Sequence, residues 1–299
     1  MNTTAKTSDA LLHVDNATMQ FGGLTALTSF CLDVKKGDLQ GLIGPNGAGK
    51  TTAFIVMTGV YAPTSGNIVV DGQRLNGSKP HRVNRAGLAR TFQNIRLFKD
   101  LNAADNVRVA CLVGDRPPAS IFNRGRLEQR RRDGQRLVAH TLDAVGNYLD
   151  WWRTFLQTSA FRRDEERITE TAHRLLEVMG LGHRKDELAR NLPYGEQRRL
   201  EIARALATSP KVLLLDEPAA GMNTREKGEL MKLIRKIRDD FDLGVLLIEH
   251  DMKLVMGICE KITVLDHGET IAIGTPLEVK QHQKVIEAYL GVESKELQA

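Results

Sequence analysis

LQGLIGPNGAGKTT, at residues 39–52, is the most informative stretch of this chain. An apolar run that includes Leu42 and Ile43 ends in a glycine-rich turn, and Lys50 opens a segment that we expect to be helical. Strand, loop and helix in this order, with the spacing GxxxxGK(S/T), are typical of a phosphate-binding P-loop. Glycines let backbone N–H groups approach phosphate oxygens, and the start of the helix adds a positive dipole. The stretch therefore predicts that the chain binds a nucleotide.

Four side chains in and beyond this loop are candidates for binding phosphate and Mg²⁺ and for activating water. The Lys50 ammonium supplies a point charge for the β- and γ-phosphates, and the Thr51 hydroxyl can bind Mg²⁺. Asp216 and Glu217 end an apolar strand at residues 212–217. In a P-loop enzyme one acid at that place supports the Mg²⁺ ligands, and a second can orient the attacking water. Many strands end in acids, so the P-loop is what makes this pair significant.

Length and composition limit the class of protein. A chain of 299 residues suits one large domain or a core with a subdomain. The three cysteines, Cys31, Cys111 and Cys259, are an odd number without metal-ligand spacing, which indicates structural thiols in a reducing cytosol. The start, MNTTAKTSDA, lacks the apolar segment of a signal peptide, and no apolar run approaches the roughly 20 residues of a membrane span. We therefore expect a soluble protein whose membrane role, if any, depends on a partner.

Strand-like and helix-like patterns alternate along the chain. Residues 212–217 are apolar on both faces, which predicts a central strand of a parallel sheet. The expected strands are residues 11–14, 25–34, a segment ending at 69–70, 88–93, 212–217, 244–248, 262–268 and 269–274. The expected helices are residues 103–113, 166–179, 196–207, 224–238 and a C-terminal stretch that ends at Leu290. The alternation favours an α/β fold with ligand chemistry at the carboxyl ends of the strands.

A resemblance appears at LPYGEQRRLEIARAL, residues 192–206, directly before VLLLDEP. This segment resembles the signature of ABC ATPases, and with Gln93 in its own loop and His250 after a later strand the family's motifs occur in order over nearly the whole chain. The resemblance implies a RecA-like P-loop ATPase core with a mostly parallel sheet, an antiparallel β subdomain and an α-helical subdomain. The implied divisions of a single domain at 1–299 are a core at 11–93 and 208–275, a helical subdomain at 94–207 and a tail at 276–299.

The resemblance also implies a role for each motif residue. Phe21 would stack on adenine, and Gln93 would touch metal and water and sense the transporter. Asp216 would support Mg²⁺ together with Thr51 and Gln93, Glu217 would be the general base, and His250 would sense the γ-phosphate. The triphosphate of ATP would lie against Gly44, Pro45, Asn46, Gly47, Ala48, Gly49, Lys50, Thr51 and Thr52.

Plainer interpretations stay open for three of these residues. Phe21 beside glycines could be a core aromatic, Gln93 a solvated loop residue, and His250 a polar cap at the end of a strand.

The chain departs from the family pattern at two places, one in the signature and one in the D-loop. Pro193 replaces the serine and is followed by Tyr194, so a hydroxyl and one N–H donor are lost, although the Gly195 N–H and the helix dipole can still face a phosphate. Asn223 replaces the D-loop aspartate and loses its charge. In this family the signature completes the ATP site of a partner subunit, here through Leu192, Pro193, Tyr194, Gly195, Glu196 and Gln197. Our hypothesis is that the site built with this signature is the weaker of the two.

Further segments resemble one branch of the family. FGGLTAL at 21–27, GLARTFQNIRLFKDL at 87–101, EPAAGMN at 217–223 and the segments 249–276 and 285–291 resemble the LivG-type ATPases of branched-chain amino-acid importers. This implies an ATP-hydrolysing subunit at the cytoplasmic face of a bacterial inner membrane. Its implied partners are a second, related ATPase (or a second copy), two membrane permeases and a periplasmic binding protein. Because the binding protein and the permeases select the solute, this chain does not reveal it.

Three rival functions compete with this one. The nearest is the same ATPase in another transporter, such as a lipid exporter. A soluble ABC ATPase acting on ribosomes or DNA usually has two cassettes or a long coiled coil, whereas this chain has one P-loop and no heptad run, so we expect no nucleic-acid partner. A small-molecule kinase would not explain residues 192–197.

An arginine-rich segment at 116–167 is longer than the family pattern, and we interpret much of it as an insertion. It holds eleven arginines, no lysine and seven acidic residues, and an apolar helical face ends at Trp152. The segment could be an extra helix of the helical subdomain, a contact with the permease or membrane surface, or a nucleic-acid site. The last is the least favoured because the charges are mixed and no recognition motif accompanies them.

Overall fold

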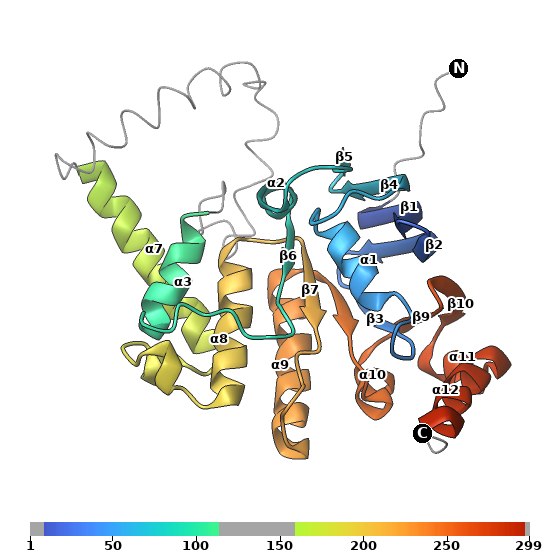
Figure 1. Ribbon diagram of the computed structural model, residues 1–299. Coiled ribbons are helices and arrows are strands. Elements are labelled where there is room, and N and C mark those ends of the chain that lie inside the picture. The colour runs from blue at the N-terminus through green and yellow to red at the C-terminus, as the bar shows by residue number, and fades with distance from the viewer. Residues whose placement is uncertain (1–8, 114–158, 297–299) are drawn as a thin grey trace, which may run out of the picture.

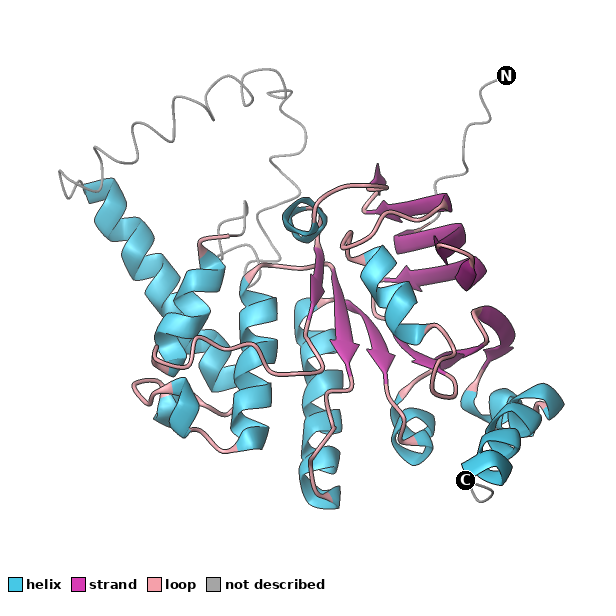
Figure 2. Cartoon of the chain, viewed as in Figure 1, coloured by secondary structure: helices cyan, strands magenta, loops and turns pink. Residues whose placement is uncertain are grey.

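The computed structural model describes residues 9–113 and 159–296. Within these residues the strands form a six-stranded sheet and a separate four-stranded sheet, with helices around them (Figures 1 and 2). The predicted fold class is confirmed: a mostly parallel α/β core, an antiparallel β part and a group of helices. The segment that we interpret as an insertion lies almost entirely outside the described residues, apart from its last residues at the start of a helix.

The six-stranded sheet runs in the order β10-β9-β3-β8-β7-β6. Its strands are β3 (Leu39–Ile43), β6 (Leu88–Arg90), β7 (Val212–Asp216), β8 (Gly244–Ile248), β9 (Lys261–Asp266) and β10 (Glu269–Gly274). All neighbours are parallel except β9 and β10. Every residue of β3, β7 and β8 is buried, as their apolar composition requires. Since the strands are parallel, the loops after β3, β6, β7 and β8 meet at one edge.

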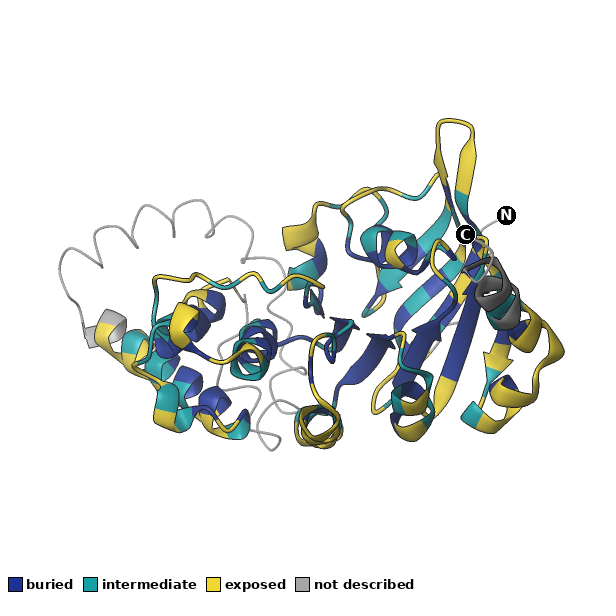
Figure 3. Cartoon of the chain, turned by 60° about the horizontal axis from the view of Figure 1, so that its bottom comes forward, coloured by how far each residue is buried: buried dark blue, intermediate teal, exposed yellow. Residues whose placement is uncertain are grey.

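The two faces of this sheet border two hydrophobic cores. Along β7, Leu213 and Leu215 pack into one core, whereas Val212 and Leu214 pack into the other. Alternate residues of a strand point to opposite faces, so β7 needs apolar residues throughout. Figure 3 shows the central strands as a dark blue layer with the exposed residues at the periphery.

The four-stranded sheet runs in the order β2-β1-β4-β5 and is antiparallel. Its strands are β1 (Ala10–Phe21), β2 (Leu24–Lys35), β4 (Ser65–Val70) and β5 (Gln73–Arg74). The prediction of a short strand at 11–14 was wrong in length, because β1 continues to Phe21. An irregular register between Val14 and Ala17, where Asn16 has φ 47°, interrupts the period-2 pattern and concealed the rest of the strand.

Three helices form a group on the side of the core away from the four-stranded sheet (left in Figure 1). They are α3 (Ala103–Cys111), α7 (Ser159–Val178) and α8 (Tyr194–Ala207), and they share one core through Val107, Leu175 and Leu200. The remaining helices are α1 (Lys50–Met57), α2 (Pro80–Arg85), α9 (Thr224–Phe241), α10 (Met252–Ile258), α11 (Pro276–Gln281) and α12 (Gln283–Glu296). The short helices α2 and α10 were not predicted, because six or seven residues give too little of a helical period to recognise. The single C-terminal helix that we expected is divided into α11 and α12 at His282.

The three cysteines differ in how far they are buried. All three are free thiols, of which Cys31 is exposed while Cys111 and Cys259 are buried. Burial raises the pKa of Cys111 to about 11 and that of Cys259 to about 12, so both stay neutral thiols at physiological pH. In the helices of residues 9–113 and 159–296, no stretch has both the length and the apolarity to cross a membrane.

Candidate functional site

The P-loop connects β3 to α1 at the centre of the molecule (Figure 1). Gly44 has φ 153°, and a Cβ there would lie 2.1 Å from the carbonyl oxygen of Leu265. Gly49 caps α1 with φ 98°, and its Cβ would lie 2.7 Å from the carbonyl oxygen of Ala26. Only glycine fits both positions, so the chain can turn sharply and direct the first N–H groups of α1 at a bound anion.

Lys50 is the first residue of α1, and its side chain bends back over the loop. Its Nζ donates to the carbonyl oxygens of Gly44 at 2.7 Å and Pro45 at 2.8 Å, and the residue is 6% exposed. Burial lowers the pKa of Lys50, while the carboxylates of Glu217 and Asp216 oppose that shift. The lysine therefore lies within the electrostatic field of both acids that end β7.

Glu217 follows β7, and two side chains from the loops after β6 and β8 converge on it. Gln93 Nε2 donates to its Oε2 at 2.9 Å, and His250 Nε2 lies 2.5 Å from its Oε1. Glu217 has φ 46°, which is unusual for a residue with a side chain, and its N–H donates to the carbonyl of Ile248 at 2.9 Å. The structure thus brings together Glu217, His250 and Gln93, the three residues for which the resemblance implies a catalytic role. Gln93 and His250 are both exposed and lie outside the strands, so these contacts are added to the plainer interpretations and do not replace them.

Asp216 is the last residue of β7 and is held by an arginine that the sequence did not point to. Arg90 Nη2 donates to Asp216 Oδ2 at 2.7 Å, and both side chains are largely buried. The Arg90 guanidinium also lies 5.5 Å from the ring centroids of Phe54 and Phe92. The ion pair fixes the orientation of the carboxylate.

The donor set expected for Mg²⁺ fits a hard cation. A hydroxyl (Thr51), an amide (Gln93) and a carboxylate (Asp216) supply oxygen ligands, which Mg²⁺ prefers together with water and phosphate oxygens. In the described part of the chain no three His, Cys, Asp or Glu side chains converge as a metal site. An ion brought in with a nucleotide needs no such cluster.

Phe21 lies at the end of β1 and is 41% exposed. Its ring meets that of Tyr61 edge to face, with the centroids 5.5 Å apart. Phe21 is therefore not a core residue, and its exposed face is available to a planar ligand. Tyr61 is a second exposed aromatic that the motifs did not single out.

The signature residues surround the start of α8. Pro193 is the N-cap, and its carbonyl accepts the N–H groups of Glu196 and Gln197, each at 2.9 Å. The N–H groups of Tyr194 and Gly195 precede the first intrahelical bonds and can face an anion. The Tyr194 ring lies over Gly221, where an added Cβ would stand 3.4 Å from Cε1 of the ring.

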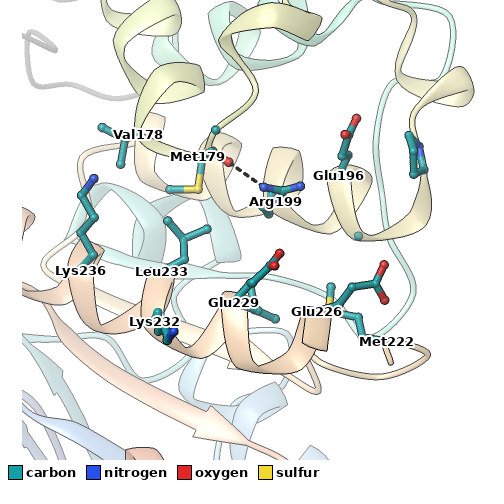
Figure 4. A pocket seen from close by; sticks show the side chains of 14 residues that line it. Val178, Met179, Glu196, Arg199, Met222, Glu226, Glu229, Lys232, Leu233 and Lys236 are labelled. Carbon is teal, nitrogen blue, oxygen red and sulfur yellow. Dashed lines mark hydrogen bonds between the residues drawn. The ribbon is translucent and has the colours of Figure 1, made fainter. Parts of the chain in front are cut away.

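A cavity of about 430 Å³ lies beside the signature, between the end of α7 and the helices α8 and α9 (Figure 4). Its walls carry basic side chains of Arg199, Lys232 and Lys236 and acidic side chains of Glu196, Glu226 and Glu229. Because the charges are mixed, the cavity does not present a field of one sign.

Asn223 caps α9. Its Oδ1 accepts the N–H of Glu226 at 3.0 Å, and the Glu226 side chain accepts the N–H of Asn223 at 3.0 Å, which completes a capping box. The amide thus retains a helix-capping role that an aspartate would also perform.

Sequence reasoning missed three buried polar residues next to these motifs. Glu249 accepts the N–H of Ala219 at 2.8 Å, and burial raises its pKa. Arg198 and Glu201 on α8 bind the backbone of the loop that carries Gln93. A charged pair three residues apart within an apolar helix face is the signal that could have revealed Arg198 and Glu201.

The comparisons with known proteins agree with this geometry. The family model described as "ABC transporter" matches residues 27–220, and that described as "Branched-chain amino acid ATP-binding cassette transporter" matches residues 269–295. The high-affinity branched-chain amino acid transport ATP-binding protein BraF of Pseudomonas aeruginosa is 42% identical over 95% of this chain and 99% of its own. Its counterpart LivG of Escherichia coli K12 is 40% identical over the same shares. A crystal structure of an ATP-binding cassette of an ABC transporter in its ADP conformation is 25% identical, with a TM-score of 0.72, over 95% of this chain and all of that chain.

Identity at this level over almost the full length of both chains, on the same fold, establishes the family. The tail that resembles one branch lies within the segment that the branch's own model matches. The chain belongs to the ATP-binding cassette transporter family, in its branched-chain amino acid group, as a subunit that binds and hydrolyses ATP and works with membrane permeases.

Proposed function

We propose that this chain powers the import of branched-chain or other hydrophobic amino acids, with Glu217 as the general base for ATP hydrolysis. The observation that carries the proposal is the convergence of Gln93 and His250 on the Glu217 carboxylate, within the field of Lys50. A carboxylate with two hydrogen-bonding neighbours at the edge of the P-loop can orient a water and accept its proton. The solute class follows the relatives, whose names describe branched-chain amino acid transport.

The remaining motif residues take the roles that the resemblance implies. The backbone of residues 44–52 and the Lys50 ammonium hold the phosphates, and Phe21 stacks on the adenine through its exposed face. Thr51, Gln93 and Asp216 would hold Mg²⁺, which neutralises charge on the phosphates. His250 senses the γ-phosphate from its position beside the Glu217 carboxylate.

The working unit has two ATPase subunits. ATP would close them face to face, so that the P-loop of each faces the signature of the other. The partner is a second, related ATPase or a second copy, and the pair acts with two permeases and a periplasmic binding protein at the cytoplasmic face of the inner membrane. The start of α8 supports this arrangement. The N–H groups of Tyr194 and Gly195 can bind an anion there, although no phosphate-binding loop precedes this helix.

The altered signature predicts unequal sites. Pro193 caps α8 without a side-chain hydrogen bond, whereas a serine could add one hydroxyl and one N–H donor. We expect Pro193→Ser to raise turnover at the partner's nucleotide by about 10- to 100-fold, the value of one hydrogen bond to a charged group. Turnover is measured separately at each composite site, with the other site disabled by substituting its P-loop lysine. Equal rates at the two sites of the unmodified pair would contradict the hypothesis.

Uptake of radiolabelled leucine tests the proposed transport function. In bacteria from which the gene has been deleted, high-affinity uptake should fall to the level of cells that lack the permeases. The unmodified chain should restore it, and the Glu217→Gln chain should not. Unchanged leucine uptake together with a defect in lipid export would favour the rival transporter.

A further inference from the structure

Arg198 has the contacts of a residue that positions other groups. It lies on α8 one turn after Gly195 and is 0% exposed. Its guanidinium donates to three backbone carbonyls from two loops: Phe92 at 2.5 Å, Gln93 at 3.0 Å and Glu217 at 2.9 Å. One arginine of the signature helix therefore holds the backbone of both loops that carry Gln93 and Glu217.

Glu201, one turn further along α8, completes the arrangement. Its Oε2 accepts from Arg198 Nη1 at 2.7 Å, and its Oε1 accepts the N–H groups of Phe92 at 3.2 Å and Arg96 at 3.4 Å. The pair thus binds the loop after β6 through both its carbonyl and its N–H groups.

The contacts bear directly on the Glu217 carboxylate. Glu217 is held in a left-handed backbone conformation. Its N–H donates to Ile248, and its carbonyl accepts from Arg198 at 2.9 Å and from the N–H of Ala220 at 3.2 Å. A residue with a side chain leaves this conformation unless neighbouring groups retain it. Arg198 also holds the carbonyl of Gln93, whose side chain donates to the same carboxylate. One guanidinium therefore binds the backbone of both partners in the Gln93–Glu217 hydrogen bond.

We propose that Arg198, supported by Glu201, is a positioning residue that aligns Gln93 and Glu217 from the signature helix. Glu217, the proposed general base, is then aligned for catalysis only while α8 keeps its position against the core. The inference rests on the proposed function for the role of Glu217. A misplacement of about 1 Å at a catalytic group can lower turnover about 10²-fold, so loss of this alignment should appear in kcat.

The test is Arg198→Lys in the full-length chain. A single ammonium lacks the planar fork that reaches three carbonyls and a carboxylate, so kcat should fall about 10- to 100-fold. The Kd for a fluorescent ATP analogue should stay within about threefold, because the P-loop contacts are not altered. Arg198→Met should lower kcat further than Arg198→Lys, since it keeps none of the hydrogen bonds.

Amide hydrogen exchange supplies a readout that does not depend on turnover. In Arg198→Lys the amides of residues 91–97 should exchange faster, because the loop loses its contacts with α8. The matched control is Arg199→Lys. Arg199 is the next residue of α8, but its guanidinium faces the cavity beside the signature, where Nη1 donates to the carbonyl of Met179 at 3.4 Å (Figure 4). That variant should keep kcat within about twofold and leave the exchange unchanged, since its lost contact is a weak, long hydrogen bond.

The possible outcomes separate the inference from the proposed function. A kcat for Arg198→Lys within about twofold of the unmodified chain, with unchanged exchange at 91–97, would overturn the inference. Equal losses of ATP affinity and kcat would also overturn it, as would failure of both Arg198→Lys and Glu201→Gln to fold, because each indicates a scaffold role. If the transporter assembled with its second ATPase subunit and its permeases hydrolyses no ATP, the proposed function fails, and the exchange comparison still decides whether Arg198 orders the loop.

Discussion

Replacing Glu217 with glutamine is expected to lower ATP turnover by about 10²- to 10⁴-fold, the usual contribution of a general base. Glutamine has the same shape and can still accept the hydrogen bond that Gln93 donates at 2.9 Å, but it cannot take a proton from water. ATP affinity should stay within about threefold, because Glu217 is not part of the loop that binds the phosphates. Phosphate release and equilibrium binding of ATP to the purified full-length chain measure the two quantities.

The control for this prediction is the same chemical change at Glu249. This residue follows β8 and is buried, and a glutamine there can still accept the N–H of Ala219, which Glu249 binds at 2.8 Å. Glu249→Gln should therefore keep turnover within about threefold, since that hydrogen bond survives. Near-normal hydrolysis by Glu217→Gln, or an equal loss in both variants, would refute Glu217 as the base.

The second large effect is expected at Lys50. Its ammonium donates to the carbonyls of Gly44 and Pro45, and these donors can turn to phosphate oxygens when a nucleotide binds. Lys50→Ala removes a charge-assisted interaction of about 1.5–3 kcal/mol per hydrogen bond, so ATP affinity should fall about 100-fold. Isothermal titration with Mg-ATP gives the affinity, and thermal melting shows whether the fold persists.

Lys36 provides a matched control for Lys50. Its ammonium lies 3.2 Å from Asp242 in an exposed ion pair, which contributes little to stability. Lys36 is not among the residues expected to bind the phosphates. Lys36→Ala should leave ATP affinity unchanged. An affinity for Lys50→Ala equal to that of Lys36→Ala would contradict the predicted phosphate contact.

Much of the fold could be predicted because its signals are local. The strand before the P-loop, the buried strand at β7 and helices α8 and α9 each show their period or their apolar run within a few residues. The predicted length of β1 was wrong because the irregularity at Asn16 broke the pattern, and α10 was not predicted because it is only seven residues long. The predicted subdomain boundaries, and the interpretation of residues 116–158, stay predictions.

The candidate site was predicted by motif, and its supporting residues were not. Arg90 and Arg198 lie within the segments 87–101 and 192–206, but the motifs gave them no role. Their partners are distant in sequence: Arg90 binds Asp216 across 126 positions, and Arg198 binds Phe92 across 106. A pattern of residue types along the chain does not encode such pairs. The assigned roles of Gln93, Glu217 and His250 stay predictions, although the structure brings their side chains together.

The class of chemistry follows from residue types and their spacing. A glycine-rich loop with Lys50 and Thr51 allows close approach to phosphates in any chain that folds as strand, loop and helix. Which groups meet at Glu217, and what holds them there, became known from the folded chain. The physical reason is that parallel strands carry their following loops to one edge, so Gln93 after β6, Glu217 after β7 and His250 after β8 become neighbours. Their alignment then depends on Arg198, a buried side chain from a helix outside the sheet.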